Sequence, residues 1–322
     1  MKNNKKYGVI VLIVIVVTAV LSAVFGFVFP DKKSGSSDTK GNPNIQYIME
    51  KKSRNGYIGA VYISGVIQSE NSEYNQKWLL DTISSLKNDR NNKGLALIIN
   101  SPGGTVYEAD EAYLAVQDYK TTGKPVYVYQ EKLAASGGYY ISCAANKIFA
   151  NRNTLTGSIG VITASSYDLT GLFEKLGIKS ETIHSGKNKN MFSINESVTD
   201  EQRKIMQSIA DETYEQFTGI VAVNRNIPLA EVKKIADGRI YTANQALQNG
   251  LIDGIDTKDG MFETMAKDFF NDEKLPVIDY KYEKEQKFRD FILGSFFKGD
   301  EKKALNKIFA ETSIQYPAYL YN

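Results

Sequence analysis

Strand-like and helix-like segments alternate along the middle of the sequence, and this alternation narrows the possible folds more than any other feature. Short apolar runs typical of buried strands are separated by longer amphipathic runs typical of helices. Strands that alternate with helices form a mainly parallel sheet covered by helices. We therefore predict one α/β domain over residues 56–268. Its strands are expected at residues 57–67, 95–100, 125–129, 147–150 and 159–163, and its helices at residues 73–87, 106–119 and 139–145.

Ser136 lies at one of the predicted strand-to-helix junctions, in the small-residue stretch Ala-Ala-Ser-Gly-Gly at residues 134–138. A serine there is at a helix N-terminus, where unpaired N–H groups and the helix dipole favour negative charge. The same groups would stabilise an attacking alkoxide or an oxyanion, so Ser136 is a candidate nucleophile. The alternative is a tight turn in which the small residues only let the helix pack closely on the sheet.

A second junction carries glycines whose N–H groups no side chain covers. Residues 100–104, Asn-Ser-Pro-Gly-Gly, follow the predicted strand at residues 95–100. Loops at the carboxyl ends of parallel strands meet at one edge of the sheet, so this loop is expected near Ser136. An oxyanion hole needs such a loop beside the nucleophile. Further along, Gly-Ser-Ile-Gly occupies residues 157–160 and Ser-Gly-Lys-Asn-Lys occupies residues 185–189.

These four stretches resemble the signal peptide peptidase A family, membrane-anchored serine peptidases with a Ser-Lys dyad on a Clp- and crotonase-like fold. The resemblance implies that Ser136 is the nucleophile and Lys189 the general base. It implies that the hydroxyl of Ser158 positions the lysine amine. It also implies that the backbone N–H groups of Gly103 and Gly137 receive the oxyanion, without a metal or another cofactor.

The general base has competitors in the sequence. Histidine is the usual base for a serine nucleophile, and His184, at the end of a predicted short strand at residues 181–184, is the only histidine. A lysine can do the same work where desolvation lowers its pKa toward neutrality. Lys189 follows the glycine of its motif by three residues, as in the family, and Lys187 is the competing lysine.

The beginning of the sequence predicts a membrane anchor. Three nearby lysines precede residues 7–29, a run without charges. At about 1.5 Å per residue this helix would be about 34 Å long, enough to cross a bilayer core. A cleaved signal peptide, the alternative, has a shorter apolar region of about 7 to 15 residues. We expect residues 1–30 to form the anchor with the N-terminus in the cytoplasm, residues 31–55 to form a flexible linker, and the catalytic domain to be extracytoplasmic.

Composition excludes some functions. A net charge of +2 over 322 residues gives no electrostatic case for binding nucleic acid. Cys143 is the only cysteine, so an intramolecular disulfide is impossible. We expect Cys143 to be a buried packing thiol rather than a nucleophile.

The second half of the sequence predicts helices and a strand that have a structural role rather than a catalytic one. Thr199 can cap a long helix with a buried side that includes Ile209 and Phe217, and residues 228–236 form another helix. A strand and a helix capped by Thr242 follow. In the family, this last region stacks protomers into a ring whose sites are built across neighbours. With one Ser-Lys core per chain, about eight copies would complete that ring.

The last part, residues 269–322, is expected to contain a helical segment and an extended tail. Residues 287–297 fit a helix that covers the body or touches the membrane surface. The aromatic tail at residues 316–322 could pack on a neighbour or lie as a strand in the substrate groove, and both alternatives stay open.

These observations predict a membrane-anchored serine endopeptidase that hydrolyses remnant signal peptides and other apolar, unfolded peptides. Its nucleophile would be Ser136 and its base Lys189. Two alternatives remain. One is a Clp-like or crotonase-like hydrolase with His184 as base, and the other is a catalytically inactive membrane scaffold whose glycine loops only pack.

Overall fold

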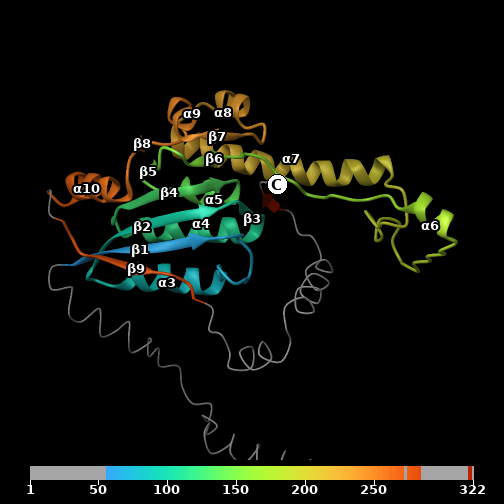
Figure 1. Ribbon diagram of the computed structural model, residues 1–322, viewed down its shortest axis with the longest axis horizontal. Helices are drawn as coiled ribbons and strands as arrows, with labels where there is room; N and C mark the ends of the chain where they lie inside the picture. The colour runs from blue at the N-terminus through green and yellow to red at the C-terminus, as the bar shows by residue number, and fades with distance from the viewer. Residues whose placement is uncertain (1–55, 272–273, 284–317, 321–322) are drawn as a thin grey trace, which may run out of the picture. The chain divides into compact units, whose positions relative to one another are not determined.

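The computed structural model describes residues 56–271, 274–283 and 318–320, and an eight-stranded sheet organises them (Figure 1). Its strands are β1 Tyr57–Ser64, β2 Asn92–Ser101, β4 Val126–Ala135, β5 Lys147–Ala150, β6 Leu155–Gly157, β7 Ile240–Thr242, β8 Gly254–Ile255 and β9 Val277–Tyr280. Their order is β7-β6-β4-β2-β1-β9, with β5 between β4 and β8. Among these pairs only β6 and β7 are antiparallel. The prediction of an α/β fold with a mainly parallel sheet is confirmed.

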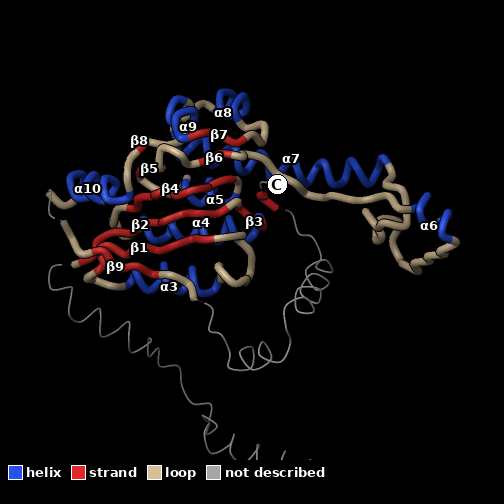
Figure 2. Tube along the Cα trace, viewed as in Figure 1, coloured by secondary structure: helices blue, strands red, loops and turns tan. Residues whose placement is uncertain are grey.

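Helices cover both faces of the central strands (Figure 2). Gly59 of β1 faces α3, because a Cβ atom there would lie 2.8 Å from Leu86. The neighbouring residues of β1 point the other way and join a cluster that contains Met261 and Met265 of α10. Strands buried on both faces are apolar along their whole length, which explains the continuous apolar runs in the sequence. The helices are α3 Gln76–Asn88, α4 Val106–Lys120, α5 Gly137–Ser142, α6 Thr170–Leu176, α7 Asp200–Arg225, α8 Leu229–Ile235, α9 Ala243–Gln248 and α10 Lys258–Phe269.

A bulge divides β4 into two halves with different neighbours. Ile99 of β2 pairs with Gln130, whereas Ser101, two residues later, pairs with Ala134, four residues later. The additional residues of β4 therefore bulge at residues 131–133. The first half of β4 pairs with β5 and the second half with β6. Because a bulge bends its strand, this one turns the end of β4 onto the small pair formed by β6 and β7.

Two strand predictions are wrong. Residues 159–163 form no strand, and the strand of this region is β6, which ends before them. The reason is local, since Gly157 and Ser158 have φ values of 85° and 50° and turn the chain out of the extended conformation. Residues 181–184 also form no strand, so His184 lies in a loop.

The predicted helix caps are confirmed, but one predicted core residue is exposed. Thr199 and Thr242 both accept a hydrogen bond from a backbone N–H group in a capping box. Along α7, Phe217 is buried as expected, whereas Ile209 is 39% exposed. Strand β9 was not expected from the sequence, and it extends the sheet in parallel beside β1.

The segment between β6 and α7 leaves the sheet. We call residues 160–199 the arm; it contains α6 and no buried residue. Figure 1 shows α6 near the outer end of α7. Apolar side chains on the arm face solvent, among them Tyr167, Leu176 and Ile183 with exposed fractions of 78%, 63% and 94%.

Several predictions fall on residues that the structure does not describe. The anchor at residues 7–29, the linker at residues 31–55 and the helix at residues 287–297 are among them. Within the described ranges, no helix has both the length and the apolar character needed to cross a membrane. Three residues of the tail are described, and they form strand β10 Ala318–Leu320 beside β3 Gly103–Thr105.

The bulge in β4 gives a first prediction. The buried Thr154 hydroxyl donates to the backbone carbonyls of Gln130, at 3.0 Å, and Glu131. Thr154→Val removes this donor at nearly constant volume. We expect the free energy of unfolding to fall by about 0.5–1.5 kcal/mol, the net contribution of one hydrogen bond, because the Gln130 carbonyl still accepts from the Asn151 N–H at 3.1 Å. Denaturant unfolding measures the change.

The matched control is Thr121→Val. The Thr121 hydroxyl donates to the Asp118 carbonyl at 2.7 Å, but on the surface, where water replaces it. The control should change the free energy of unfolding by less than about 0.5 kcal/mol. Equal losses in both variants would contradict the assignment of Thr154 as the residue that holds the bulge.

Candidate active site

Ser136 follows β4 directly and precedes α5 in a conformation that residues other than glycine seldom adopt. Its φ is 54° and its ψ is −117°. The backbone on both sides is anchored. The Ser136 N–H donates to the Gly157 carbonyl at 2.7 Å, and the Ser136 carbonyl accepts from the Tyr140 N–H at 2.8 Å. Such a conformation costs on the order of 1–3 kcal/mol and persists only where the surroundings impose it.

The Ser136 hydroxyl is buried without a hydrogen-bond partner among the described residues. The residue is 0% exposed, and its Oγ atom has neither donor nor acceptor within bonding distance. Buried hydroxyl groups are nearly always paired, so an exception needs an explanation. One explanation is that the Ser136 hydroxyl is a nucleophile, which forms hydrogen bonds only when its base and its substrate are present.

The glycine loop, residues 100–104, lies beside Ser136 as predicted. A Cβ atom on Gly137 would lie 3.4 Å from the Gly103 Cα atom and 3.3 Å from the Gly104 nitrogen. The two predicted oxyanion donors, Gly103 and Gly137, are therefore neighbours. In this structure the Gly103 N–H donates to the Ser101 hydroxyl at 3.1 Å. An oxyanion at Gly103 would have to replace that contact.

Ser158 lies next to Ser136. Strands β4 and β6 are parallel and pair Ala135 with Gly157, and each serine is the residue that directly follows its strand. Ser158 is 5% exposed, has a φ of 50° and donates its N–H to the Arg239 carbonyl at 2.9 Å. The structure thus brings four predicted site residues together at the carboxyl edge of the sheet.

Lys189 is not among them. It is exposed on the arm, and its backbone N–H donates to the Gly186 carbonyl at 3.0 Å. The competitor Lys187 forms an exposed ion pair with Glu201 at 2.8 Å, which lowers the pKa of that carboxyl group through a hydrogen bond. His184 is also exposed, with Nδ1 3.1 Å from the Gly186 carbonyl. Within one chain, all three candidate bases lie on the exposed arm.

A polar chain under α5 was not anticipated from the sequence. Gln130, at the middle of β4, is fully buried and donates from Nε2 to the Ser142 hydroxyl at 3.1 Å. Ser142 in turn donates to the Gly138 carbonyl at 2.8 Å. This chain ties the first turn of α5, and with it the turn at Ser136, to the sheet. The sequence feature that could have indicated this polar chain is the glutamine directly after the apolar run of β4.

Cys143 has the packing role that was expected. It is 1% exposed at the end of α5, and burial raises the pKa of its thiol to about 12. A thiol is nucleophilic as the thiolate, which is scarce near neutral pH at such a pKa. Ser136 is thus the nucleophile candidate of this junction.

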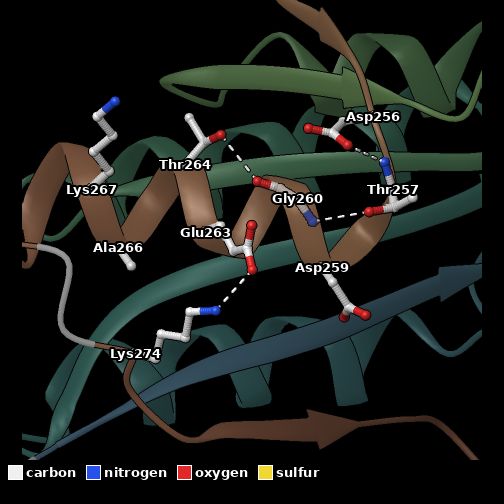
Figure 3. Close-up of a pocket in the computed structure, with 9 residues that line it drawn as sticks. All are labelled: Asp256, Thr257, Asp259, Gly260, Glu263, Thr264, Ala266, Lys267 and Lys274. Atoms are coloured by element: carbon white, nitrogen blue, oxygen red, sulfur yellow. Dashed lines mark hydrogen bonds and ion pairs between the residues drawn. The ribbon is translucent and has the colours of Figure 1, made fainter.

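A separate hollow of about 590 Å³ lies along α10 (Figure 3). Its walls carry an ion pair of 2.8 Å between Lys274 and Glu263, and Thr257 caps the helix by accepting from the Gly260 N–H. None of the predicted site residues lines it. Helix α10 packs near Tyr127 at the beginning of β4, whereas Ser136 follows the end of that strand. The hollow is therefore not part of the site around Ser136.

Comparison with known proteins identifies the class of protein to which this chain belongs. Residues 118–269 match peptidase family S49. A protein of Synechocystis sp., provisionally named protease slr0021, is 35% identical over 65% of this chain and 73% of its own length. The chain therefore belongs to peptidase family S49, a family of serine peptidases.

Individual relatives narrow the similarity further. A protein of Enterococcus faecium, provisionally named signal peptide peptidase SppA, is 39% identical over 72% of this chain and 66% of its own length. The chloroplastic serine protease SPPA of Arabidopsis thaliana is 34% identical over 60% of this chain and 28% of its own length. Among solved structures, a mutant of ClpP1 from Listeria monocytogenes has 19% identity and a TM-score of 0.44, and covers 68% of this chain and 99% of that chain.

The strained turn at Ser136 gives a second prediction. Ser136→Gly removes the Cβ atom that makes a positive φ unfavourable, whereas Ser136→Ala keeps it. We expect the glycine variant to be more stable than the alanine variant by about 1–2 kcal/mol. Both variants lose the hydroxyl, so the comparison isolates the backbone. Thermal unfolding of the two proteins measures it, and an alanine variant of equal or higher stability would show that the turn is not strained.

Proposed function

We propose that this chain is a serine endopeptidase that cleaves peptides through an acyl-enzyme on Ser136, with Lys189 as general base. The observation that carries the proposal is the buried Ser136 hydroxyl, which has no hydrogen-bond partner in the described part of the chain and lies beside the glycine pair Gly103 and Gly137. Membership of peptidase family S49 and the similarity to a protein named SppA support it.

The reaction follows from these groups. The neutral amine of Lys189 takes the proton of the Ser136 hydroxyl, and the oxygen attacks the carbonyl carbon of the peptide. Backbone N–H groups of Gly103 and Gly137 stabilise the resulting oxyanion, each by about 2.7–4 kcal/mol. The intermediate collapses as the lysine returns the proton to the leaving amine. Water, deprotonated by the same lysine, then hydrolyses the ester and restores Ser136.

The base would come from a neighbouring copy of the chain. Lys189 is exposed on an arm that buries none of its residues and leaves Tyr167 and Ile183 largely exposed. Apolar side chains grouped on such a segment favour burial against a partner. An arm laid on the next protomer would bury them and carry Lys189 toward the partner's serine and Ser158. Repeated head to tail, this contact closes a ring, for which we propose about eight copies.

The substrates would be apolar, unfolded segments such as remnant signal peptides. A chain that binds along the edge of β3 would be held by backbone hydrogen bonds, with alternate side chains in pockets. Residues 7–29 would anchor the protein in the cell membrane with the N-terminus in the cytoplasm, so the site would meet apolar segments first. Alkaline extraction tests the anchor, because a chain that starts at Gly56 should leave the membrane fraction whereas the full chain stays. Loss of the full chain to the soluble fraction would contradict it.

The decisive experiment measures cleavage of a leucine-rich signal peptide by assembled full-length protein. Ser136→Ala and Lys189→Ala should each lower kcat/KM by at least about a thousandfold, since either loss removes the activated nucleophile. Lys187→Ala and His184→Ala are the matched controls from the same arm and should retain most activity. Loss in His184→Ala together with an active Lys189→Ala would favour the histidine alternative. Undiminished cleavage by Ser136→Ala would overturn the proposal, and absence of cleavage by the native protein would favour the inactive scaffold.

Co-expression of the two inactive variants tests the shared site. A contact between a chain with Ser136 and a neighbour with Lys189 is complete, so random assembly should restore about a quarter of the native activity. If serine and lysine act within one chain, the mixed assembly stays inactive. This outcome would contradict a site shared between neighbouring chains, but it would not contradict the assignment of Ser136 as nucleophile and Lys189 as base.

A further inference from the structure

Strand β3 lies outside the eight-stranded sheet, so the backbone bonds of that sheet do not hold it. It lies against α4 and α5 (Figure 1). On one edge its backbone bonds to Ile67, whose N–H donates to the Gly103 carbonyl at 2.9 Å and whose carbonyl accepts from the Thr105 N–H at 2.8 Å. The approach is close, since a Cβ atom on Gly104 would lie 1.7 Å from the Ile67 oxygen. The backbone of Ile67 therefore holds the strand that contains a candidate oxyanion donor.

The Asn71 side chain fixes the residue before Ile67. Asn71 lies in the loop between β1 and α3. Its Oδ1 atom accepts from the N–H groups of Glu73 and Tyr74, each at 2.8 Å. Its Nδ2 atom donates to the Val66 carbonyl at 2.7 Å. These partners define the orientation of the amide, because two donors face its oxygen and an acceptor faces its nitrogen.

One peptide group joins Asn71 to Gly103. The Val66 carbonyl and the Ile67 N–H belong to the same planar group, and in a trans peptide they point in opposite directions. Asn71 bonds to the carbonyl and Gly103 to the N–H. Hydrogen bonds in such a chain polarise one another, so that each is strengthened by its neighbour. A change at Asn71 therefore acts on Gly103.

This chain of hydrogen bonds reaches the candidate active site. The Gly103 carbonyl shares a peptide group with the Gly104 nitrogen, which lies 3.3 Å from the position of a Cβ atom on Gly137. On its other side, Gly103 donates its N–H to the Ser101 hydroxyl at 3.1 Å. Gly103 is thus held from both sides. Its position matters because an oxyanion hole works only where its donors already point to the place at which the charge develops.

We propose that Asn71 is a positioning residue for the oxyanion hole, because it holds Gly103 in place through the peptide group between Val66 and Ile67. This inference rests on the proposed function, which gives Gly103 the role of oxyanion donor. Asn71 would act on the transition state and not on the bound peptide. Its loss should therefore lower kcat and leave KM almost unchanged.

Two substitutions in the assembled full-length protein separate this role from general support of the loop. Asn71→Asp keeps an oxygen for the N–H groups of Glu73 and Tyr74 but removes the donor to Val66. It should lower kcat for the leucine-rich signal peptide by at least about tenfold, with KM within about twofold of the native value, since a displaced donor weakens transition-state stabilisation. Asn71→Ala removes all three bonds and should lower kcat at least as much.

The matched control is Gln68→Ala. The Gln68 side chain lies in the same loop and also donates from an amide to a backbone carbonyl, that of Glu70, at 3.0 Å. This carbonyl is not part of the peptide group that bonds to Gly103. The control should keep kcat and KM within about twofold of the native values.

A pair of inhibitors reports on the oxyanion hole itself. The Ser136 oxygen adds to the carbonyl carbon of a peptide aldehyde, its proton passes to the base, and the former aldehyde oxygen takes the place of the oxyanion. The peptide alcohol of the same sequence binds without forming this oxyanion. Asn71→Asp should weaken the aldehyde by about the same factor as kcat/KM and leave the affinity for the alcohol within about twofold. Partial unfolding would instead leave both inhibition constants at their native values, because inhibition is measured on the active fraction.

Several outcomes would overturn the role of Asn71 while Ser136 remains the nucleophile. They are a native kcat in Asn71→Asp, native affinity for the aldehyde despite a lower kcat, an equal loss of affinity for aldehyde and alcohol, and a loss in Gln68→Ala as large as that in Asn71→Asp. Absence of cleavage by the native protein would instead overturn the proposed function, and the inference with it.

Discussion

The parallel register of β2, β4 and β6 is the constraint on which the candidate site depends. It makes three strands end at one edge, so the glycine loop, Ser136 and Ser158 follow one another in space although they are far apart along the chain. The bulge in β4 is part of this register, because without its additional residues Ser136 would leave the sheet in another direction. Thr154 and Gln130 are the polar residues that hold the bulge and the helix after it.

Burial has two opposite consequences at this edge. Around α5 it fixes the turn, since small residues allow the helix to approach the sheet and Cys143 is buried at the end of the helix. At the Ser136 hydroxyl it leaves a polar atom that has no partner among the residues that the structure describes, which a structure devoted to stability would avoid. The strained φ of the same residue adds a second local cost. Both costs fall on one residue, as expected where function and stability compete.

The arm, in contrast to the surroundings of Ser136, is exposed to solvent. It carries Lys189 and buries nothing, although its sequence contains apolar residues such as Ile183. A single chain therefore brings the candidate nucleophile Ser136, the glycine pair and Ser158 together, but not the candidate base Lys189. The proposed ring addresses this arrangement, since a neighbouring copy of the chain would complete the site.

The sequence by itself determined the alternation of strands and helices, the caps at Thr199 and Thr242 and the serine at a strand-to-helix junction. These features depend on residues close together in the chain, where spacing and propensity act directly. Tertiary structure alone decided the bulge of β4, the edge strand β9 and the pairing of the tail with β3, because backbone pairing joins distant segments and leaves little trace in side-chain pattern. It also decided that Lys189 is exposed. The neighbouring residues in the sequence identify the motif of Lys189, but only the packing of the chain shows which groups lie close to its amine.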